Sequence, residues 1–287
     1  MAPPPPTQGA SLQQRLLQLA QTLQFAWFAG HVTLLLCTTR YVLSYITFNA
    51  ASKWARFSYR TAFVAAGVTY GIVVYKSFRA RARAGKSQGS PLAIIADENV
   101  QYLAMALVWL FAHQVPLAVF PFAVYSLFHV ATYTRSNLLP AISPAPAANS
   151  ATASPGGSNR PKSNSALADT IGRFVKDYYD SSMTIVAGLE IALWVRLLFP
   201  ALTFQKGTWL LLLAYTVFLR ARYAQSTFVQ GAFGQAGAYV DSFANRQDSP
   251  PALRNAWATV KGVLRQALQA TDINRFAGAQ GPVKKAQ

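Results

Sequence analysis

The chain has 287 residues, of which 52% are hydrophobic and 12% are charged. Soluble domains carry about 25% charged residues, so this composition argues against a soluble domain and favours a multi-pass membrane protein. The net charge of +17 lies mostly beside apolar segments, which is typical of positive-inside topology and of attraction to anionic lipids. No nucleic-acid-binding motif accompanies the charge, so we expect no nucleic acid partner.

Residues 1–24 are expected to form a disordered leader followed by an interfacial helix. The first ten residues are proline-rich, and Ser11 can cap a short amphipathic helix. Its leucines form one face and its glutamines the other, which is the arrangement of a helix that lies along the membrane surface. The apolar segment that follows has no signal-peptide cleavage pattern and is expected to stay inserted.

The next region is predicted to be a first membrane bundle, which comprises residues 25–134 with hairpins at 25–78 and 100–134. In the first hairpin, Arg40 interrupts an apolar segment and has to reach the interface or find a partner. Gly67 and Gly71 form a GxxxG motif, which predicts close approach of a neighbouring helix.

The second hairpin contains no Asp, Glu, Lys or Arg over residues 100–134. As one helix this stretch would extend about 50 Å, against a hydrocarbon core of about 30 Å. Pro116 lies near its middle and lacks the N–H that a helix interior needs. We therefore predict two arms of roughly 24 and 28 Å. The reversal between them should lie at or within the membrane, where neighbouring helices satisfy its backbone groups.

Residues 135–180 are predicted to be a flexible linker and a helix leading into the membrane, because 140–165 is rich in Pro, Ala, Ser, Asn and Gly. Residues 181–222 are predicted to form a third membrane hairpin, in which Pro200 and Gly207 separate two apolar segments. The whole chain is thus expected to be all-α, with about six membrane segments in short helical hairpins and with cytosolic amphipathic helices.

The basic residues that flank the hairpins predict the topology. Lys76 opens the densest basic run of the chain, which continues to Lys86. If each hairpin folds as predicted, this run and the other basic flanks share one face, which the positive-inside rule assigns to the cytosol. Both termini are therefore expected to be cytosolic. Lys284 and Lys285 resemble the dilysine ER-retrieval signal, which agrees with this topology.

The last region, 223–287, is expected to hold cytosolic amphipathic helices and a basic tail. Glycines weaken the helical pattern of 223–243, whereas a cleaner amphipathic helix begins at Pro250 and Pro251. Its apolar face with a basic border suits the membrane interface; docking on the protein's own bundle or on a partner is the alternative. The predicted membrane-binding residues are Leu253, Trp257, Val260, Leu264 and Leu268, bordered by Arg254, Lys261 and Arg265.

The sequence offers no constellation for catalysis or for metal binding. The three histidines occupy different apolar segments without metal-ligand spacing, and the single cysteine, Cys37, excludes a cysteine-rich site. No nucleophile, nucleotide-binding or paired-carboxylate motif occurs. We therefore predict a protein that is not an enzyme and that needs no metal or cofactor.

Glu190 lies inside an apolar segment and has to be neutralised, by protonation or by a cation such as Arg196 or Arg40. A competing hypothesis makes a cluster of Arg40, Glu190 and His129 the centre of a small ER transporter or lipid-handling enzyme. It requires the three side chains to converge on an accessible cavity. A third hypothesis, an ER adaptor in stress signalling or calcium regulation, also stays open.

The second hairpin carries a family resemblance. The run PLAVFP at 116–121 and the run YSLFHVATYT at 125–134 resemble the signature of the transmembrane protein 33 (Krüppel-homologue-2) family. That family includes the fungal nuclear-pore-membrane and ER proteins of the Pom/Per type, and the similarity covers roughly residues 25–245. The motif residues are Pro116, Pro121, Tyr125, Ser126, His129, Thr132 and Tyr133.

This resemblance implies a non-enzymatic protein of the ER membrane and nuclear envelope that stabilises or senses curved membrane. It implies association with nuclear pore complexes, a contribution to pore distribution and assembly, and a part in ER tubule organisation. In the pore-associated fungal members a C-terminal amphipathic helix binds curved membrane and contacts an importin, and the matching element here is the helix at 250–271. The expected partners are anionic and curved membrane lipids, nucleoporins, reticulon-type tubule-shaping proteins and an importin of the karyopherin-β class.

Overall fold

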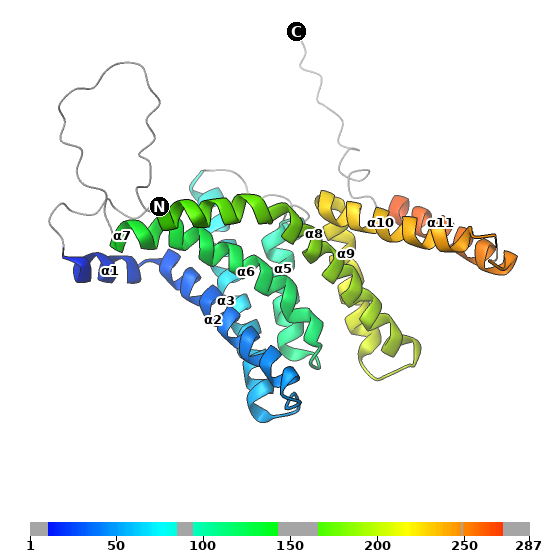
Figure 1. Cartoon of the computed structure of the whole chain (residues 1–287), viewed down its shortest axis with the longest axis horizontal. Helices are drawn as coiled ribbons and strands as arrows, with labels where there is room; N and C mark the ends of the chain where they lie inside the picture. Colours follow the sequence, from blue (N-terminus) through cyan, green and yellow to red (C-terminus); the bar gives the residue numbers. More distant parts are fainter. Residues whose placement is uncertain (1–10, 85–93, 143–165, 248, 272–287) are drawn as a thin grey trace, which may run out of the picture. The chain divides into compact units, whose positions relative to one another are not determined.

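The computed structural model describes residues 11–84, 94–142, 166–247 and 249–271, and within them every regular element is a helix (Figure 1). The prediction of an all-α membrane protein is therefore confirmed. The leader, most of the predicted linker, and Lys284 and Lys285 lie outside the described residues. The chain divides into two compact units, Met1–Leu219 and Arg220–Gln287.

Six helical segments of the first unit correspond to the predicted membrane segments. By length and composition, three of them can cross a membrane: α3 (Lys53–Arg83), the helical run Pro116–Ile142 and α8 (Ala166–Leu202). The other three are α2 (Leu23–Ile46), α5 (Glu98–Phe111) and α9 (Thr208–Gln225). The 14 residues of α5 span about 21 Å, less than a hydrocarbon core of about 30 Å.

The run Pro116–Ile142 changes its helical type along its length. It consists of η1, a 3₁₀ turn (Pro116–Ala118), α6 (Val119–Tyr133), η2, a π-helical turn (Thr134–Leu138), and α7 (Leu139–Ile142). The reversal between α5 and η1 lies where the sequence predicts it, immediately before Pro116.

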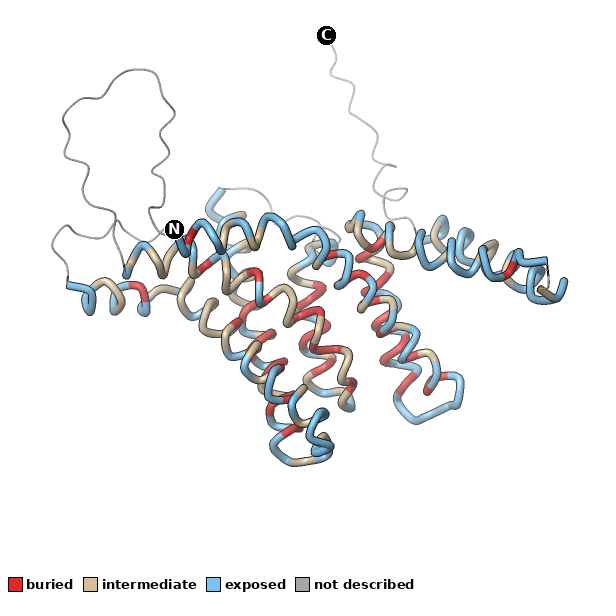
Figure 2. Tube along the Cα trace, viewed as in Figure 1, coloured by how far each residue is buried: buried red, intermediate tan, exposed pale blue. Residues whose placement is uncertain are grey.

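The helices of the first unit pack in an order that follows the hairpins. α2 packs against α3 and α6, α3 against α5, and α6 against α8. Buried residues lie along the facing sides of these helices (Figure 2). Aromatic rings fill much of this core: the ring of Tyr102 on α5 lies 5.4 Å from Tyr70, 5.6 Å from Phe122 and 5.3 Å from Phe218. Such pairs stabilise helix packing beyond their buried area.

The interfacial helix at the N-terminus begins at its predicted cap. In α1 (Leu12–Ala20), Ser11 Oγ accepts the N–H of Gln14 at 3.2 Å, and Gln14 Oε1 accepts the N–H of Ser11 at 3.0 Å. This reciprocal capping box satisfies two donors that the first turn leaves open.

The turns of the first and third hairpins share an unusual residue. Phe48 follows α2 and Phe204 follows α8, and both have φ of 55° in the left-handed region, which normally suits glycine. Their side chains are 99% and 80% exposed. A strained, exposed phenylalanine is favourable where the turn meets lipid, because aromatic rings concentrate at the membrane interface.

Two helices differ from their predicted form. α8 begins at Ala166, so the helix that leads into the membrane and the membrane segment are one continuous helix, which changes direction midway (Figure 1). The stretch 223–243, in which glycines weaken the helical pattern, forms α10 (Thr227–Ala244). Each glycine costs a helix about 1 kcal/mol, and α10 forms in spite of this cost, packed against the next helix.

The GxxxG prediction is wrong for the described residues. A Cβ placed on Gly71 meets no atom within 4 Å, and one on Gly67 meets only the Leu107 side chain at 4.0 Å. The close approach lies instead at Gly30 of α2, where an added Cβ would lie 2.5 Å from Thr69 Cγ2. Thr69 is fully buried and its hydroxyl donates to the carbonyl of Ala66, so it cannot easily move away.

We predict that Gly30→Ala destabilises the chain while Gly71→Ala does not. Overpacking of this kind costs about 1–3 kcal/mol, whereas alanine at an open helical position gains about 1 kcal/mol over glycine. Thermal unfolding of both variants in the same mild detergent measures the difference. Equal melting temperatures for the two variants would contradict the assignment of the contact to Gly30.

Candidate membrane-binding site

The reversal between α5 and η1 is held by two side chains of α3. Arg60 donates to the carbonyl of Trp109 at 3.2 Å and to that of Leu110, two of the carbonyls that the end of α5 leaves open. The hydroxyl of the buried Tyr59 accepts the N–H of Val115 at 3.2 Å and donates to its carbonyl at 3.5 Å. Neighbouring helices thus satisfy this backbone, as the sequence predicts.

The motif residues of the family resemblance start at this reversal and continue along α6. Pro116 is the first residue of η1, and Pro121 lies in the first turn of α6, where an N–H would have no helical acceptor. The hydroxyl of Tyr125 lies 3.3 Å from that of Tyr102, within hydrogen-bond distance. These residues join α6 to α5.

The second half of the motif faces α2. The fully buried Ser126 hydroxyl lies 2.9 Å from His31 Nδ1, and the rings of His31 and His129 are 4.7 Å apart. Tyr133 stacks on Phe28 with ring centroids 4.5 Å apart. Thr132 lines a pocket together with His129 and Tyr133.

Glu190 lies at a contact between α8 and α5. It is buried and accepts a hydrogen bond from the Tyr102 hydroxyl. Arg40 lies on α2 and donates to Ser58 Oγ at 3.0 Å. Arg196 follows Glu190 by six residues, which places it about 240° around α8 on an exposed face.

The competing hypothesis of a transporter or lipid-handling enzyme requires Arg40, Glu190 and His129 to converge. The structure places them in three separate sets of contacts: Arg40 with Trp54 and Ser58, Glu190 with Tyr102, and His129 with Trp27 and His31. In the segments that the structure describes, no group of three or more His, Cys, Asp and Glu residues could hold a metal ion.

The second unit contains a helical hairpin, α10 and α11 (Pro251–Ala270), whose helices lie side by side (Figure 1). One carboxylate joins them: Asp241 Oδ1 of α10 accepts from Trp257 Nε1 at 2.7 Å and from Lys261 Nζ at 2.6 Å. These two donors hold the pKa of Asp241 below its usual range, the Lys261 hydrogen bond more strongly than that of Trp257.

The far end of α11 is held by Arg220, the first residue of the second unit. Its guanidinium donates to Thr271 Oγ1 at 2.7 Å and to the carbonyls of Thr271 and Leu268 at 3.0 and 3.3 Å. A cation at a helix C-terminus satisfies open carbonyls and complements the helix dipole. The sequence interpretation missed both Arg220 and Asp241. An isolated acidic residue in a strongly basic region was the available signal for Asp241.

The predicted membrane-binding face of α11 is only partly covered by α10. Trp257 is half-buried against Asp241, and Lys261 and Leu268 lie on the same side of the helix. Leu253, Val260 and Leu264 remain 39%, 45% and 52% exposed. Further exposed residues are the apolar Val263 on α11, the basic Arg254 and Arg265 on α11, and Tyr239 and Phe243 on α10. The hairpin therefore presents an apolar surface beside positive charge.

Known proteins resemble the chain over its whole length. The family model described as Transmembrane protein 33/Nucleoporin POM33 matches residues 4–269. Nucleoporin POM33 of Chaetomium thermophilum is 49% identical, with 99% of each chain covered. Two Saccharomyces cerevisiae proteins also match: Pore membrane protein of 33 kDa is 27% identical (98% of this chain, 94% of the relative), and Pore and endoplasmic reticulum protein of 33 kDa is 25% identical (84% and 88%). No solved structure matches the chain.

The contact between α10 and α11 should depend on the charge of Asp241. The pKa of Asp241 is lowered in the folded chain, so its ionised form stabilises the fold. This stabilisation is fully present above the usual carboxyl pKa of about 3.9, and it is lost as the pH falls through the lowered pKa. Asp241→Asn should reproduce this loss at neutral pH, with hydrogen exchange in α11 faster by roughly two- to fivefold, as for an exposed ion pair. Asn255→Ala on the opposite face of α11 is the matched control. Equal exchange in the two variants would show that Asp241 does not hold the helices together.

Proposed function

Since the chain belongs to the transmembrane protein 33/nucleoporin POM33 family, we propose that it acts at the nuclear pore membrane and in the ER membrane as a non-enzymatic scaffold for curved membrane. The observation that carries this proposal is the exposed apolar face of α11, which lies beside basic residues. The names of its relatives, a nucleoporin and two pore membrane proteins, support the location.

The apolar face of α11 favours lipid over water. Burial of exposed apolar area stabilises by about 25 cal/mol per Å², and a helix with such a face enters the boundary between headgroups and acyl chains. Arg254 and Arg265 are exposed on the same helix, and each basic residue near an anionic surface adds about 1 kcal/mol. Anionic membrane is therefore the surface that fits α11 best.

The preference for curved membrane follows from the insertion of these helices into one leaflet only. The hairpin of α10 and α11 would occupy area in the outer half of the cytosolic leaflet only, and α1 with its exposed Leu12 and Leu17 would do the same. An element that inserts into one leaflet fits where lipid packing is loosened by curvature. Pore membranes and ER tubules provide such curvature, and the basic flanks favour a topology with both termini in the cytosol.

The α10–α11 hairpin is also a candidate surface for protein partners. We extend the proposal to nucleoporins as neighbours, and, from the family resemblance, to reticulon-type tubule-shaping proteins and an importin of the karyopherin-β class. The basic border Arg254, Lys261 and Arg265 is available to an acidic partner only in part, because Lys261 is already paired with Asp241. Membrane binding by α11 remains the primary role.

Replacing Val260 and Leu264 together by serine should lower enrichment of the full-length chain at nuclear pores by several-fold. Both side chains are exposed and neither contacts Asp241, so the hairpin stays folded while its apolar face is lost. Trp257 is unsuitable for this test because it bonds to α10. The ratio of fluorescence at pores to that in the ER, with fluorescently tagged chains at matched expression, measures the effect.

The control for this experiment is Asn255→Ala with Gln266→Ala, on the polar face of the same helix. It should leave the pore-to-ER ratio unchanged. Unchanged enrichment of the serine variant would contradict membrane binding through α11.

A further inference from the structure

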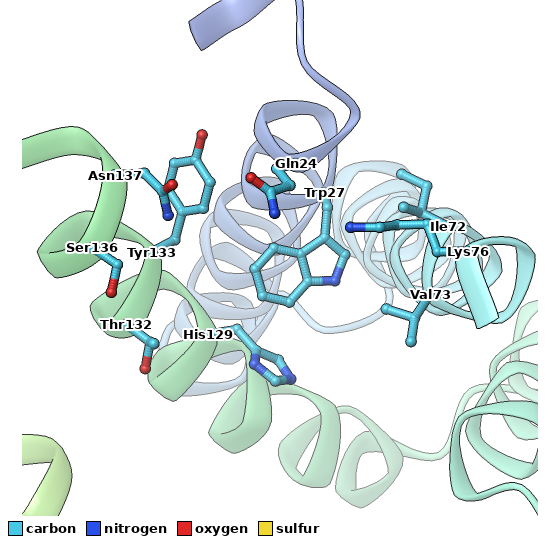
Figure 3. A pocket seen from close by; sticks show the side chains of 10 residues that line it. All are labelled: Gln24, Trp27, Ile72, Val73, Lys76, His129, Thr132, Tyr133, Ser136 and Asn137. Carbon is cyan, nitrogen blue, oxygen red and sulfur yellow. The ribbon is translucent and has the colours of Figure 1, made fainter. Parts of the chain in front are cut away.

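A pocket in the first unit lies outside the hairpin α10–α11 and is not used by the proposed function. It has a volume of about 280 Å³ and is formed by the start of α2, the end of the apolar part of α3, and the junction of α6 with η2 (Figure 3). Ligand pockets typically measure about 300–1,000 Å³; this one lies just below that range and suits a small polar group with the adjoining part of a larger molecule.

The pocket is positively charged. None of the ten residues that line it is acidic, and Lys76 is its basic residue. Figure 3 shows the Lys76 side chain extending from α3 toward Trp27. Lys76 forms no ion pair with the described part of the chain, so its charge is available to a ligand. An anion is therefore the ligand that this pocket favours.

Neutral polar side chains complete the lining. Gln24 on α2 and Thr132, Ser136 and Asn137 at the end of α6 and in η2 offer amide and hydroxyl donors on the side opposite α3 (Figure 3). A lysine with several amide and hydroxyl donors is a set suited to phosphate oxygens.

The backbone of the pocket lining departs from α-helical geometry after α6. Ser136 and Asn137 belong to η2, a π-helical turn of five residues between α6 and α7. π-helical turns are rare, and they occur frequently at functional sites because the extra residue re-aims the side chains of that turn. Here the turn that departs from α-helical geometry is also the turn that supplies two polar residues to the pocket.

The residues around the pocket favour a membrane lipid as the source of the phosphate. Lys76 begins the basic run that flanks α3, and Trp27 lies in the second turn of α2, so the pocket is at the level of the lipid headgroups on the basic side. Its other wall is apolar, made by Trp27, Ile72 and Val73. A phosphate that carries acyl chains satisfies both walls, whereas a free phosphate satisfies only the polar one.

We propose that this pocket binds the phosphate headgroup of an anionic membrane lipid, with Lys76 pairing with the phosphate and Ile72 and Val73 contacting the glycerol and the first acyl carbons. The site is a specific lipid site on the bundle, separate from the non-specific membrane surface of α11. Its failure would leave the proposed function intact, because that function depends on α1 and on the hairpin α10–α11 and not on this pocket.

Native mass spectrometry of the full-length chain in mild detergent tests this proposal with phosphatidic acid and phosphatidylcholine as probes. The chain should retain one phosphatidic acid in preference to phosphatidylcholine, whose phosphate is masked by choline. Lys76→Gln should weaken this retention roughly tenfold, as expected for the loss of one charge-assisted hydrogen bond. Arg79→Gln, which removes an equal charge one turn away outside the pocket, should have no effect.

A second variant and a competitor complete the test. Val73→Trp should fill the pocket and abolish retention without a change of charge, and thermal unfolding in the same detergent verifies that each variant is folded. Equal retention by the Lys76→Gln and Arg79→Gln variants, or equal retention of the two lipids, would overturn the proposal. Displacement of the lipid by millimolar inorganic phosphate would overturn the lipid assignment in favour of free phosphate.

Discussion

The first unit depends on the pairing of the backbone groups at the reversal between α5 and η1. A helix that reverses inside a membrane leaves open carbonyls at its end and open N–H groups at the next start, and each unsatisfied group costs several kcal/mol in hydrocarbon. Tyr59 and Arg60, adjacent residues of α3, meet this requirement for the reversal between α5 and η1. These hydrogen bonds attach the short hairpin to α3.

Other polar groups at the helix contacts act in the same way. His31 with Ser126, Arg40 with Ser58, and Tyr102 with Glu190 each join two helices. Pairs of this kind between membrane helices contribute about 1 kcal/mol each and fix which faces meet. These three pairs lie at three different helix contacts, α2 with α6, α2 with α3, and α5 with α8.

The hairpin pattern, the reversal at Pro116 and the Ser11 cap could be predicted from the sequence, because apolar length, proline and capping residues act locally. The close contact at Gly30 could not, since a glycine motif such as that of Gly67 and Gly71 gives no information about which helix lies opposite. The hydrogen bond between Glu190 and Tyr102 could not be predicted either, because no pattern in the sequence indicates which residue of another helix will lie opposite Glu190. On α11 the apolar stripe was predictable, but the share of it that α10 covers was not, because it depends on the contacts of Trp257 and Lys261 with Asp241 on another helix.

The preference of the whole chain for curved membrane is measured most directly with giant vesicles that contain anionic lipid and from which a narrow tube is pulled. The fluorescently labelled full-length chain, reconstituted in the vesicle, should be several-fold denser on the tube than on the flat membrane. The variant with serine at positions 260 and 264 should lose most of this enrichment. Equal density of the unaltered chain on tube and vesicle would contradict a curvature-dependent scaffold.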